Sequence, residues 1–139
     1  MRMLIDSSAL YKRYNREVGR DQLLAVSGRA SELVIAGHCK AEIASALNRQ
    51  RHDGLATEAD YARIMAVVKM DFEGFTLFAL DGRVEAYAIA AMEVSRLRAM
   101  DALHIGTAKA AYVDLFVTAD KRQAAAAQAE GLKIELKEA

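Results

Sequence analysis

The chain has 139 residues, of which 53% are hydrophobic, and its 19 lysines and arginines balance its 19 aspartates and glutamates. A chain of this length and composition can bury a sizeable core, so we expect one domain over residues 1–139 and exclude an intrinsically disordered protein. The zero net charge argues against a polybasic nucleic-acid binder, although it is compatible with a local basic rim.

Cys39 is the only cysteine, which excludes an intrachain disulfide and a zinc cluster built from thiolates. The first residues enter an apolar segment directly, without the charged and then apolar pattern of a signal peptide. No apolar run approaches the roughly 20 residues needed to span a bilayer. We therefore expect a soluble, cytoplasmic protein that does not associate with membranes.

Short apolar runs alternate with helical segments along the chain. Strands are expected at residues 3–5, 33–37, 75–80, 115–118 and 132–136. Helices are expected at about 8–14, 19–28, 41–54, 82–96, 101–112 and 121–130, with a further helix beginning at the capping-box sequence Thr57-Glu58-Ala59-Asp60. This alternation predicts a three-layer α/β/α sandwich around a central parallel sheet of about four to five strands.

Four acidic residues lie where such a fold would place chemistry. Asp6 and Asp120 directly follow predicted strands, while Glu42 and Asp101 lie at the starts of predicted helices. Each of them could simply cap a helix or complement its dipole. However, ligands of parallel sheets bind outside the carboxyl ends of the strands, where Asp6 and Asp120 would face each other if their strands are neighbours. The combination therefore indicates one acidic cleft.

Such a cleft requires compensation of its charge. At a separation of roughly 5 Å and an effective dielectric constant near 20, each pair of carboxylates costs about 3 kcal/mol. All-oxygen ligands favour Mg²⁺ or Mn²⁺ over zinc, and such ions can hold a phosphodiester oxygen and lower the pKa of a bound water. Ser7, Ser8 and Thr118 are candidates for orienting those waters.

The four acids lie within segments 4–10, 41–43, 97–104 and 117–122. Together, in this order and near this spacing, the segments resemble the signature blocks of PIN-domain ribonucleases, and most closely those of the VapC-type toxins of bacterial toxin–antitoxin pairs. The resemblance covers nearly the whole chain. It implies that Asp6, Glu42, Asp101 and Asp120 are catalytic, metal-binding residues of a Mg²⁺- or Mn²⁺-dependent endoribonuclease. It further implies an RNA substrate, a homodimer and a small cognate antitoxin.

One segment departs from the family pattern. Members often carry a hydroxyl residue shortly before the glutamate, whereas this chain has His38-Cys39-Lys40 before Glu42. The surroundings of Glu42 are therefore left open by the resemblance, although the glutamate itself is present.

The remaining histidines and the cysteine are expected to be structural. His104 lies three residues after Asp101 and is predicted to be packed and hydrogen-bonded rather than a ligand, because the proposed site uses oxygen ligands. His38 and His52 have no partner at metal-binding spacing and are expected on the surface. Cys39 is expected to be a small buried residue, since no catalytic Cys/His arrangement is visible.

Several basic residues adjoin the acidic segments in sequence. We predict that some of them contact RNA phosphates, with Arg13, Lys40, Arg98 and Arg122 as the candidates. The alternative interpretation is a merely solvated basic rim. Among the other acids, Asp81 is expected to cap a helix, and Asp71, Glu73 and Glu93 are expected to be solvated.

Two alternative functions remain open on the sequence. The first is a catalytically weak PIN-fold module that binds RNA, against which the presence of all four acids argues. The second is an aspartyl-phosphate phosphotransfer domain. Such phosphotransferases carry a second aspartate two residues after the nucleophile, a position that Ser8 occupies here.

Overall fold

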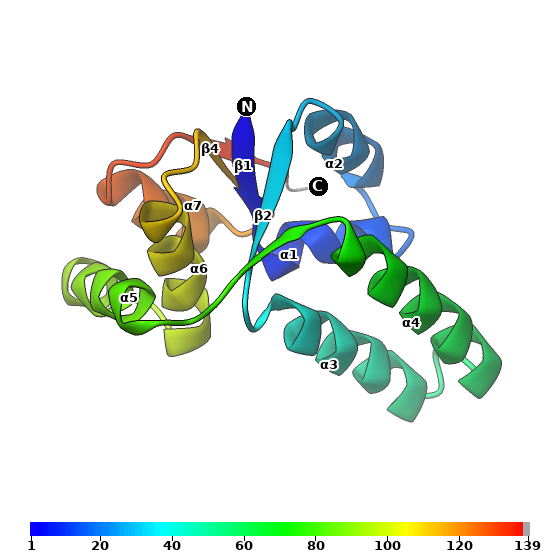
Figure 1. The fold of residues 1–139 in the computed structure, drawn as a ribbon. Coiled ribbons are helices and arrows are strands. Elements are labelled where there is room, and N and C mark those ends of the chain that lie inside the picture. The colour runs from blue at the N-terminus through cyan, green and yellow to red at the C-terminus, as the bar shows by residue number, and fades with distance from the viewer. Residues whose placement is uncertain (138–139) are drawn as a thin grey trace.

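The computed structural model describes residues 1–137 and contains a five-stranded parallel sheet in the order β3-β2-β1-β4-β5 (Figure 1). The strands are β1 (Arg2–Ile5), β2 (Glu32–Ala36), β3 (Thr76–Phe78), β4 (Leu115–Thr118) and β5 (Ile134–Leu136). The central strand β1 pairs on both sides, with Leu4 opposite Val34 of β2 and Phe116 of β4. Strands covered on both faces are apolar throughout, which explains the continuous apolar runs in the sequence.

Helices cover both faces of the sheet. They are α1 (Ser7–Leu10), continued by the 3₁₀ turn η1 (Tyr11–Arg13), α2 (Arg20–Ser27), α3 (Cys39–His52), α4 (Glu58–Glu73), α5 (Gly82–Val94), α6 (Ala99–Ala110) and α7 (Lys121–Ala129). Met3 and Ile5 of β1 pack with α1 to α4, whereas Leu4 packs with α5 to α7 (Figure 1). The predicted three-layer sandwich is therefore confirmed. None of the helices in residues 1–137 has the length and apolar character needed to cross a membrane.

The ends of several elements differ from the sequence-based expectation. The helix expected at 8–14 is a single α-helical turn followed by a 3₁₀ turn. The strand expected at 75–80 is limited to Thr76–Phe78, because it pairs only with the last three residues of β2. Helix α6 begins at Ala99 rather than at Asp101, which therefore lies inside its first turn.

The predicted helix caps are confirmed. Asp60 N donates to Thr57 Oγ1 at 3.0 Å, and Thr57 N donates to Asp60 Oδ2 at 3.1 Å, which completes the capping box of α4. Asp81 accepts a hydrogen bond from Val84 N at 3.0 Å at the start of α5.

Helix α6 packs unusually closely against α5. A Cβ atom built on Gly106 would lie 2.3 Å from Val84 O and 3.0 Å from Ala88 N, both of which are backbone atoms of α5. Glycine is therefore required at this position for the two helices to approach. Because α6 also carries Asp101 and His104, this contact fixes the depth at which both side chains are presented.

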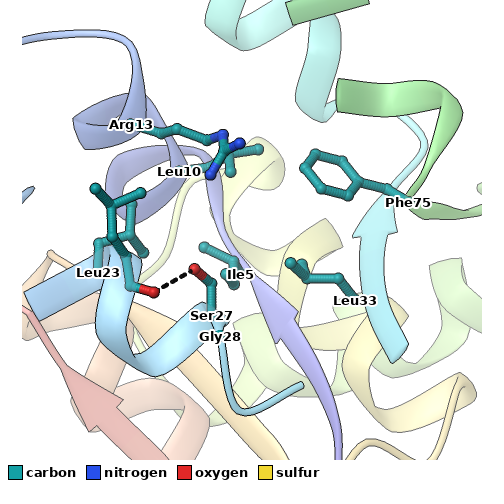
Figure 2. Close-up of a pocket in the computed structure, with 9 residues that line it drawn as sticks. Ile5, Leu10, Arg13, Leu23, Ser27, Gly28, Leu33 and Phe75 are labelled. Atoms are coloured by element: carbon teal, nitrogen blue, oxygen red, sulfur yellow. Dashed lines mark hydrogen bonds between the residues drawn. The ribbon is translucent and has the colours of Figure 1, made fainter. Parts of the chain in front are cut away.

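An apolar hollow of about 270 Å³ lies on the α1–α4 side of the sheet (Figure 2). Ile5, Leu23, Leu33 and Phe75 contribute apolar side chains to it. Arg13 is the one charged residue among the described residues that line it. No carboxylate of the described residues lines this hollow, so it is separate from the predicted acidic site.

The segments that follow the neighbouring strands β1 and β4 cross to opposite faces of the sheet. The segment leaving β1 enters α1 on one face of the sheet, whereas the segment leaving β4 enters α7 on the other face. The carboxyl ends of these two neighbouring strands therefore border a crevice, which is the usual ligand position in open α/β sheets.

Candidate metal centre

All four predicted acids line one cavity at this crevice. The cavity measures about 170 Å³ and is lined by Asp6, Ser7, Ser8, Glu42, Arg98, Asp101, His104 and Asp120. Four different elements supply the acids: Asp6 follows β1, Glu42 lies in the first turn of α3, Asp101 lies in the first turn of α6, and Asp120 follows β4. The convergence expected from adjacent strands is thus present in the structure.

Asp6 is the most deeply buried of the acids, with 3% of its surface exposed. Its carboxylate caps α1 by accepting from Ala9 N at 3.0 Å, and it also accepts from Ser8 Oγ at 2.7 Å and Thr118 Oγ1 at 2.5 Å. Burial raises the pKa of Asp6, although the positive field of His104 and these hydrogen bonds partly oppose the rise. The capping role and the cavity-lining position therefore coexist in one side chain.

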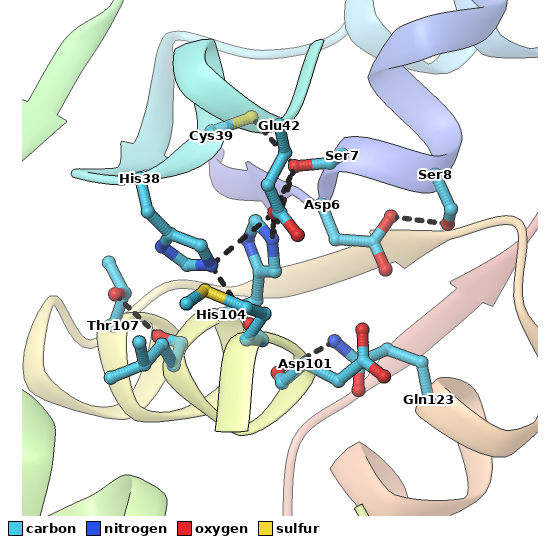
Figure 3. A network of polar contacts seen from close by, with 12 residues as sticks. Asp6, Ser7, Ser8, His38, Cys39, Glu42, Asp101, His104, Thr107 and Gln123 are labelled. Atoms are coloured by element: carbon cyan, nitrogen blue, oxygen red, sulfur yellow. Dashed lines mark hydrogen bonds and ion pairs between the residues drawn. The ribbon is translucent and has the colours of Figure 1, made fainter. Parts of the chain in front are cut away.

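Glu42 is held by a network of donors (Figure 3). Its Oε1 accepts from Ser7 Oγ at 2.6 Å and lies 2.7 Å from His104 Nε2. Burial by itself would raise the pKa of Glu42, but the hydrogen bonds from His104 and Ser7 outweigh it and the pKa is lowered. Ser7 thus supplies a hydroxyl beside Glu42, although the segment shortly before Glu42, His38-Cys39-Lys40, contains none.

The position of His38 corrects the sequence-based expectation. Its side chain is only 10% exposed, and its Nε2 lies 3.4 Å from Glu42 Oε1 and 2.8 Å from Met100 O. His38 precedes Glu42 by four residues at the start of α3, and residues at this spacing share one helix face. A histidine four residues before Glu42 is therefore the sequence signal that predicts the contact between His38 and Glu42.

The predicted burial of His104 and Cys39 and the predicted exposure of His52 are confirmed. His104 is buried and hydrogen-bonded, and its ring lies 4.3 Å from the ring of His38, centroid to centroid. His52 is exposed, and Cys39 is a buried free thiol.

Asp101 and Asp120 are more accessible than Asp6. Arg98 Nε lies 3.4 Å from Asp101 Oδ2. Asp120 caps α7, because its Oδ1 accepts from Arg122 N at 2.7 Å and Gln123 N at 3.2 Å.

Gln123 contributes a contact that the sequence did not reveal. It is 2% exposed and its Nε2 donates to Asp101 O at 2.9 Å, which ties α7 to the first turn of α6. A glutamine at the start of an alanine-rich helix gives no sequence signal for such a contact.

The basic residues predicted to contact RNA divide into two groups. Arg98 lines the acidic cavity, and Arg122 lines a neighbouring hollow with Arg96. Lys40 is exposed and its Nζ lies 5.8 Å from the centroid of the Phe72 ring. Arg13 lies outside the cavity lining.

Arg13 instead forms an ion pair that corrects the expectation for Asp71. Arg13 Nε lies 2.8 Å from Asp71 Oδ2, which also accepts from the Tyr14 hydroxyl at 2.8 Å. The Asp71 side chain is only 15% exposed. It was expected to be solvated because the sequence does not show that α4 packs beside η1.

Comparison with known proteins assigns the chain to a family. The family model described as the PIN domain matches residues 3–129. The chain belongs to the PIN-domain family. No curated protein matches its sequence.

Several solved structures have a similar fold. FitAcB from Neisseria gonorrhoeae has a TM-score of 0.75 at 13% identity, with 95% of each chain covered. The Mycobacterium tuberculosis toxin VapC20, described as cleaving the sarcin–ricin loop, has a TM-score of 0.69 at 12% identity, with 89% of this chain and 94% of that chain covered. VapBC2 from Rickettsia felis has a TM-score of 0.70 at 10% identity, with 97% of this chain and 98% of that chain covered. At these identities the likeness shows the fold alone.

The donor set of this PIN domain fits a hard divalent cation. Carboxylate oxygens are the ligands that Mg²⁺ and Mn²⁺ prefer. Asp6 is an almost fully buried acid whose three hydrogen-bond donors are neutral groups, so a cation in the cavity would compensate its charge. Among the described residues, every hydrogen bond to the Glu42 carboxylate is made to Oε1, which leaves its second oxygen available as a ligand.

Proposed function

We propose that the protein is a Mg²⁺- or Mn²⁺-dependent endoribonuclease that hydrolyses RNA phosphodiester bonds and acts as the toxin of a type II toxin–antitoxin pair. The observation that supports this most strongly is the convergence of Asp6, Glu42, Asp101 and Asp120 on one cavity of a PIN fold. Membership of this family favours a nuclease over the phosphotransfer alternative.

The chemistry follows from the roles of the side chains. Asp6, Glu42, Asp101 and Asp120 would hold the cation. When bound, the divalent ion supplies the Lewis acidity that polarises a phosphodiester oxygen and lowers the pKa of an attacking water.

Hydroxyl groups fix two of these acids before any substrate arrives. Ser8 and Thr118 orient Asp6, and Ser7 orients Glu42 through hydrogen bonds of 2.5 to 2.7 Å. Such preorganisation lowers the reorganisation needed at the moment of reaction.

Substrate binding would use the basic residues beside the acidic cavity. Arg98 lies at the cavity itself and Arg122 lies at the start of α7, so both could contact phosphates that flank the scissile bond. We propose Lys40 and Arg13 only as outer contacts, because neither lines the cavity and Arg13 already pairs with Asp71.

The partners are proposed from the structural neighbours. One of them is a toxin–antitoxin complex from Klebsiella pneumoniae, and another is VapBC2 bound to a fragment of its promoter DNA. By analogy with these complexes, we propose a small cognate antitoxin that silences this protein. From the resemblance to PIN-domain toxins we further propose a homodimer that acts on RNA in the cytoplasm.

The direct test is cleavage of RNA by purified, antitoxin-free protein. Total cellular RNA is incubated with Mg²⁺, with Mn²⁺ or with chelator, using the wild type, Asp6→Asn and Asp53→Asn. Asp53 is an exposed acid at the end of α3, so its variant is a matched control. We expect discrete fragments that require both the ion and Asp6, and that persist in Asp53→Asn.

Two results would contradict the proposal of a metal-dependent endoribonuclease. Cleavage that survives in Asp6→Asn or in chelator would contradict the proposed metal-dependent mechanism. RNA binding by well-folded wild type without cleavage under any ion would favour the RNA-binding module.

A further inference from the structure

Two histidines and a glutamate form a mixed cluster beside the carboxylate cavity. His38, Glu42 and His104 each offer one ligand atom, and these atoms all lie within 4.8 Å of one another. His38 Nε2 is 3.4 Å and His104 Nε2 is 2.7 Å from the same Glu42 oxygen. Figure 3 shows the two rings on the same side of Glu42, although they come from opposite layers of the fold.

The donor types of this cluster differ from those of the carboxylate cavity. Two imidazole nitrogens and one carboxylate oxygen suit a borderline ion such as Zn²⁺, whereas Mg²⁺ prefers oxygen alone. Three protein ligands and one open position are the usual arrangement of an accessible zinc site. The His104 side chain is 2% exposed and the Glu42 side chain is 29% exposed. The cluster is therefore buried at His104 and accessible to solvent at Glu42.

Hydrogen bonding alone does not account for both rings. If His104 Nε2 donates to Glu42 Oε1 and His38 Nε2 donates to Met100 O, each Nδ1 is left as a hydrogen-bond acceptor without a donor. Both Nδ1 atoms are buried and have no hydrogen-bond partner among the described residues. The two rings are tilted by 42° to each other, and no described residue fixes which nitrogen of either ring carries the proton. A neutral imidazole can carry its proton on Nδ1, which frees the Nε2 lone pair for a metal.

We propose that His38, Glu42 and His104 form a second metal site, which takes a divalent transition ion of the Zn²⁺ class. The site shares Glu42 with the carboxylate cavity, so a cation bound at Glu42 Oε1 reduces the negative charge that Glu42 can offer to a second cation through its other oxygen. On the proposed nuclease function, on which this last step rests, zinc inhibits cleavage by competing for one carboxylate.

The site is tested first by binding, which needs no activity. Zinc affinity is measured by competition with a chromophoric chelator for the wild type, His38→Gln and His52→Gln, with circular dichroism to verify folding. His52 is exposed and lies at the other end of α3, so its variant controls for the loss of a histidine. Loss of a ligand should cost at least as much as loss of an outer hydrogen-bond partner, so we expect about tenfold weaker binding or more in His38→Gln. Equal zinc affinity in all three proteins would overturn the proposal.

A second variant separates the two sites. Asp101 lines the carboxylate cavity but is not a member of the His–Glu–His cluster. We expect Asp101→Asn to weaken Mn²⁺ binding strongly while changing zinc affinity much less than His38→Gln does. A zinc affinity that falls equally in both variants would place zinc in the carboxylate cavity and overturn the proposal.

Inhibition of RNA cleavage by zinc is tested by comparing each protein with itself, with and without zinc. RNA cleavage at fixed Mg²⁺ is compared with and without zinc, and we expect the fractional inhibition to be smaller in His38→Gln than in the wild type. Identical zinc sensitivity in the two proteins would contradict the shared use of Glu42. If the wild type does not cleave RNA with Mg²⁺ alone, the proposed function fails, while the binding measurements still decide whether the zinc site exists.

Discussion

Asp6 combines a structural and a chemical requirement in one side chain. It caps α1, yet its carboxylate is buried against two hydroxyls and has no cationic hydrogen-bond partner among the described residues. A buried anion of this kind destabilises the fold unless an ion compensates it, which is the usual conflict between activity and stability at functional sites.

We predict that Asp6→Asn stabilises the metal-free protein by on the order of 1 kcal/mol at neutral pH, as relief of a strained functional site commonly does. The raised pKa of Asp6 means that the native state binds this proton more tightly than the unfolded state. Stability from this group is therefore present at low pH and is lost as the pH rises through the folded-state pKa. Thermal unfolding in chelator at several pH values measures the difference, which should shrink on acidification towards about pH 4. A variant less stable than wild type at neutral pH would contradict this account.

Cys39 should be chemically inert in the folded protein. Its side chain is fully buried, and burial raises the pKa of the thiol to about 12, which suppresses the nucleophilic thiolate. We expect no reaction with a thiol reagent such as Ellman's reagent at mildly alkaline pH until denaturant is added, when one thiol becomes reactive. Rapid modification of the native protein would show that α3 opens at its first turn.

At the residue scale, the sequence predicted the acids but not their neighbours. The acids were identified because strand ends and helix starts are local features. Asp71 and Gln123 were misjudged or missed because their contacts join segments that lie apart in sequence. The contact of His38 with Glu42 is local, whereas its contact with Met100 O joins distant segments.

The close contact between α5 and α6 determines how the site is presented at the element scale. We predict that Gly106→Ala destabilises the protein by about 1–3 kcal/mol, because the added methyl group would meet the backbone of α5. Gly82→Ala is the control, since a Cβ there meets nothing within 4 Å at the start of the same α5 helix. Chemical denaturation measures both, and equal stability of the two variants would contradict the packing argument.

Elements were predicted well in kind and order but less well at their ends. Apolar runs bounded by helical segments specify parallel strands almost by themselves. The end of β3 depends instead on how far β2 extends beside it, and the early start of α6 depends on Arg98, an extended N-cap residue without a side-chain cap bond. Such boundaries follow from tertiary pairing rather than from local periodicity.

At the scale of the whole molecule, a neutral chain carries an uneven distribution of charge. The acidic cavity at the carboxyl edge of the sheet has Arg98 at its wall and Arg122 beside it. The zero net charge argues against a polybasic binder, but it does not report on RNA binding through this local arrangement.

We predict that RNA affinity, measured without divalent ions, falls with salt and that Arg98→Gln and Arg122→Gln each reduce the salt slope. One phosphate contact to a single strand corresponds to a slope of about 0.7 on logarithmic axes. Arg29→Gln is the control. Arg29 lies before the amino-terminal end of β2, whereas the acidic cavity lies at the carboxyl ends of the strands, and Arg29 pairs with Glu135. Unchanged slopes in both test variants would support the alternative of a merely solvated basic rim.

The central claim is that four acids from four elements form one metal centre, and anomalous scattering from crystals soaked in Mn²⁺ tests it most directly. We predict a strong peak in the cavity lined by Asp6, Glu42, Asp101 and Asp120, which is absent from crystals of Asp6→Asn soaked in the same way. A cavity without a peak at saturating Mn²⁺, or manganese found only at surface acids, would contradict the account.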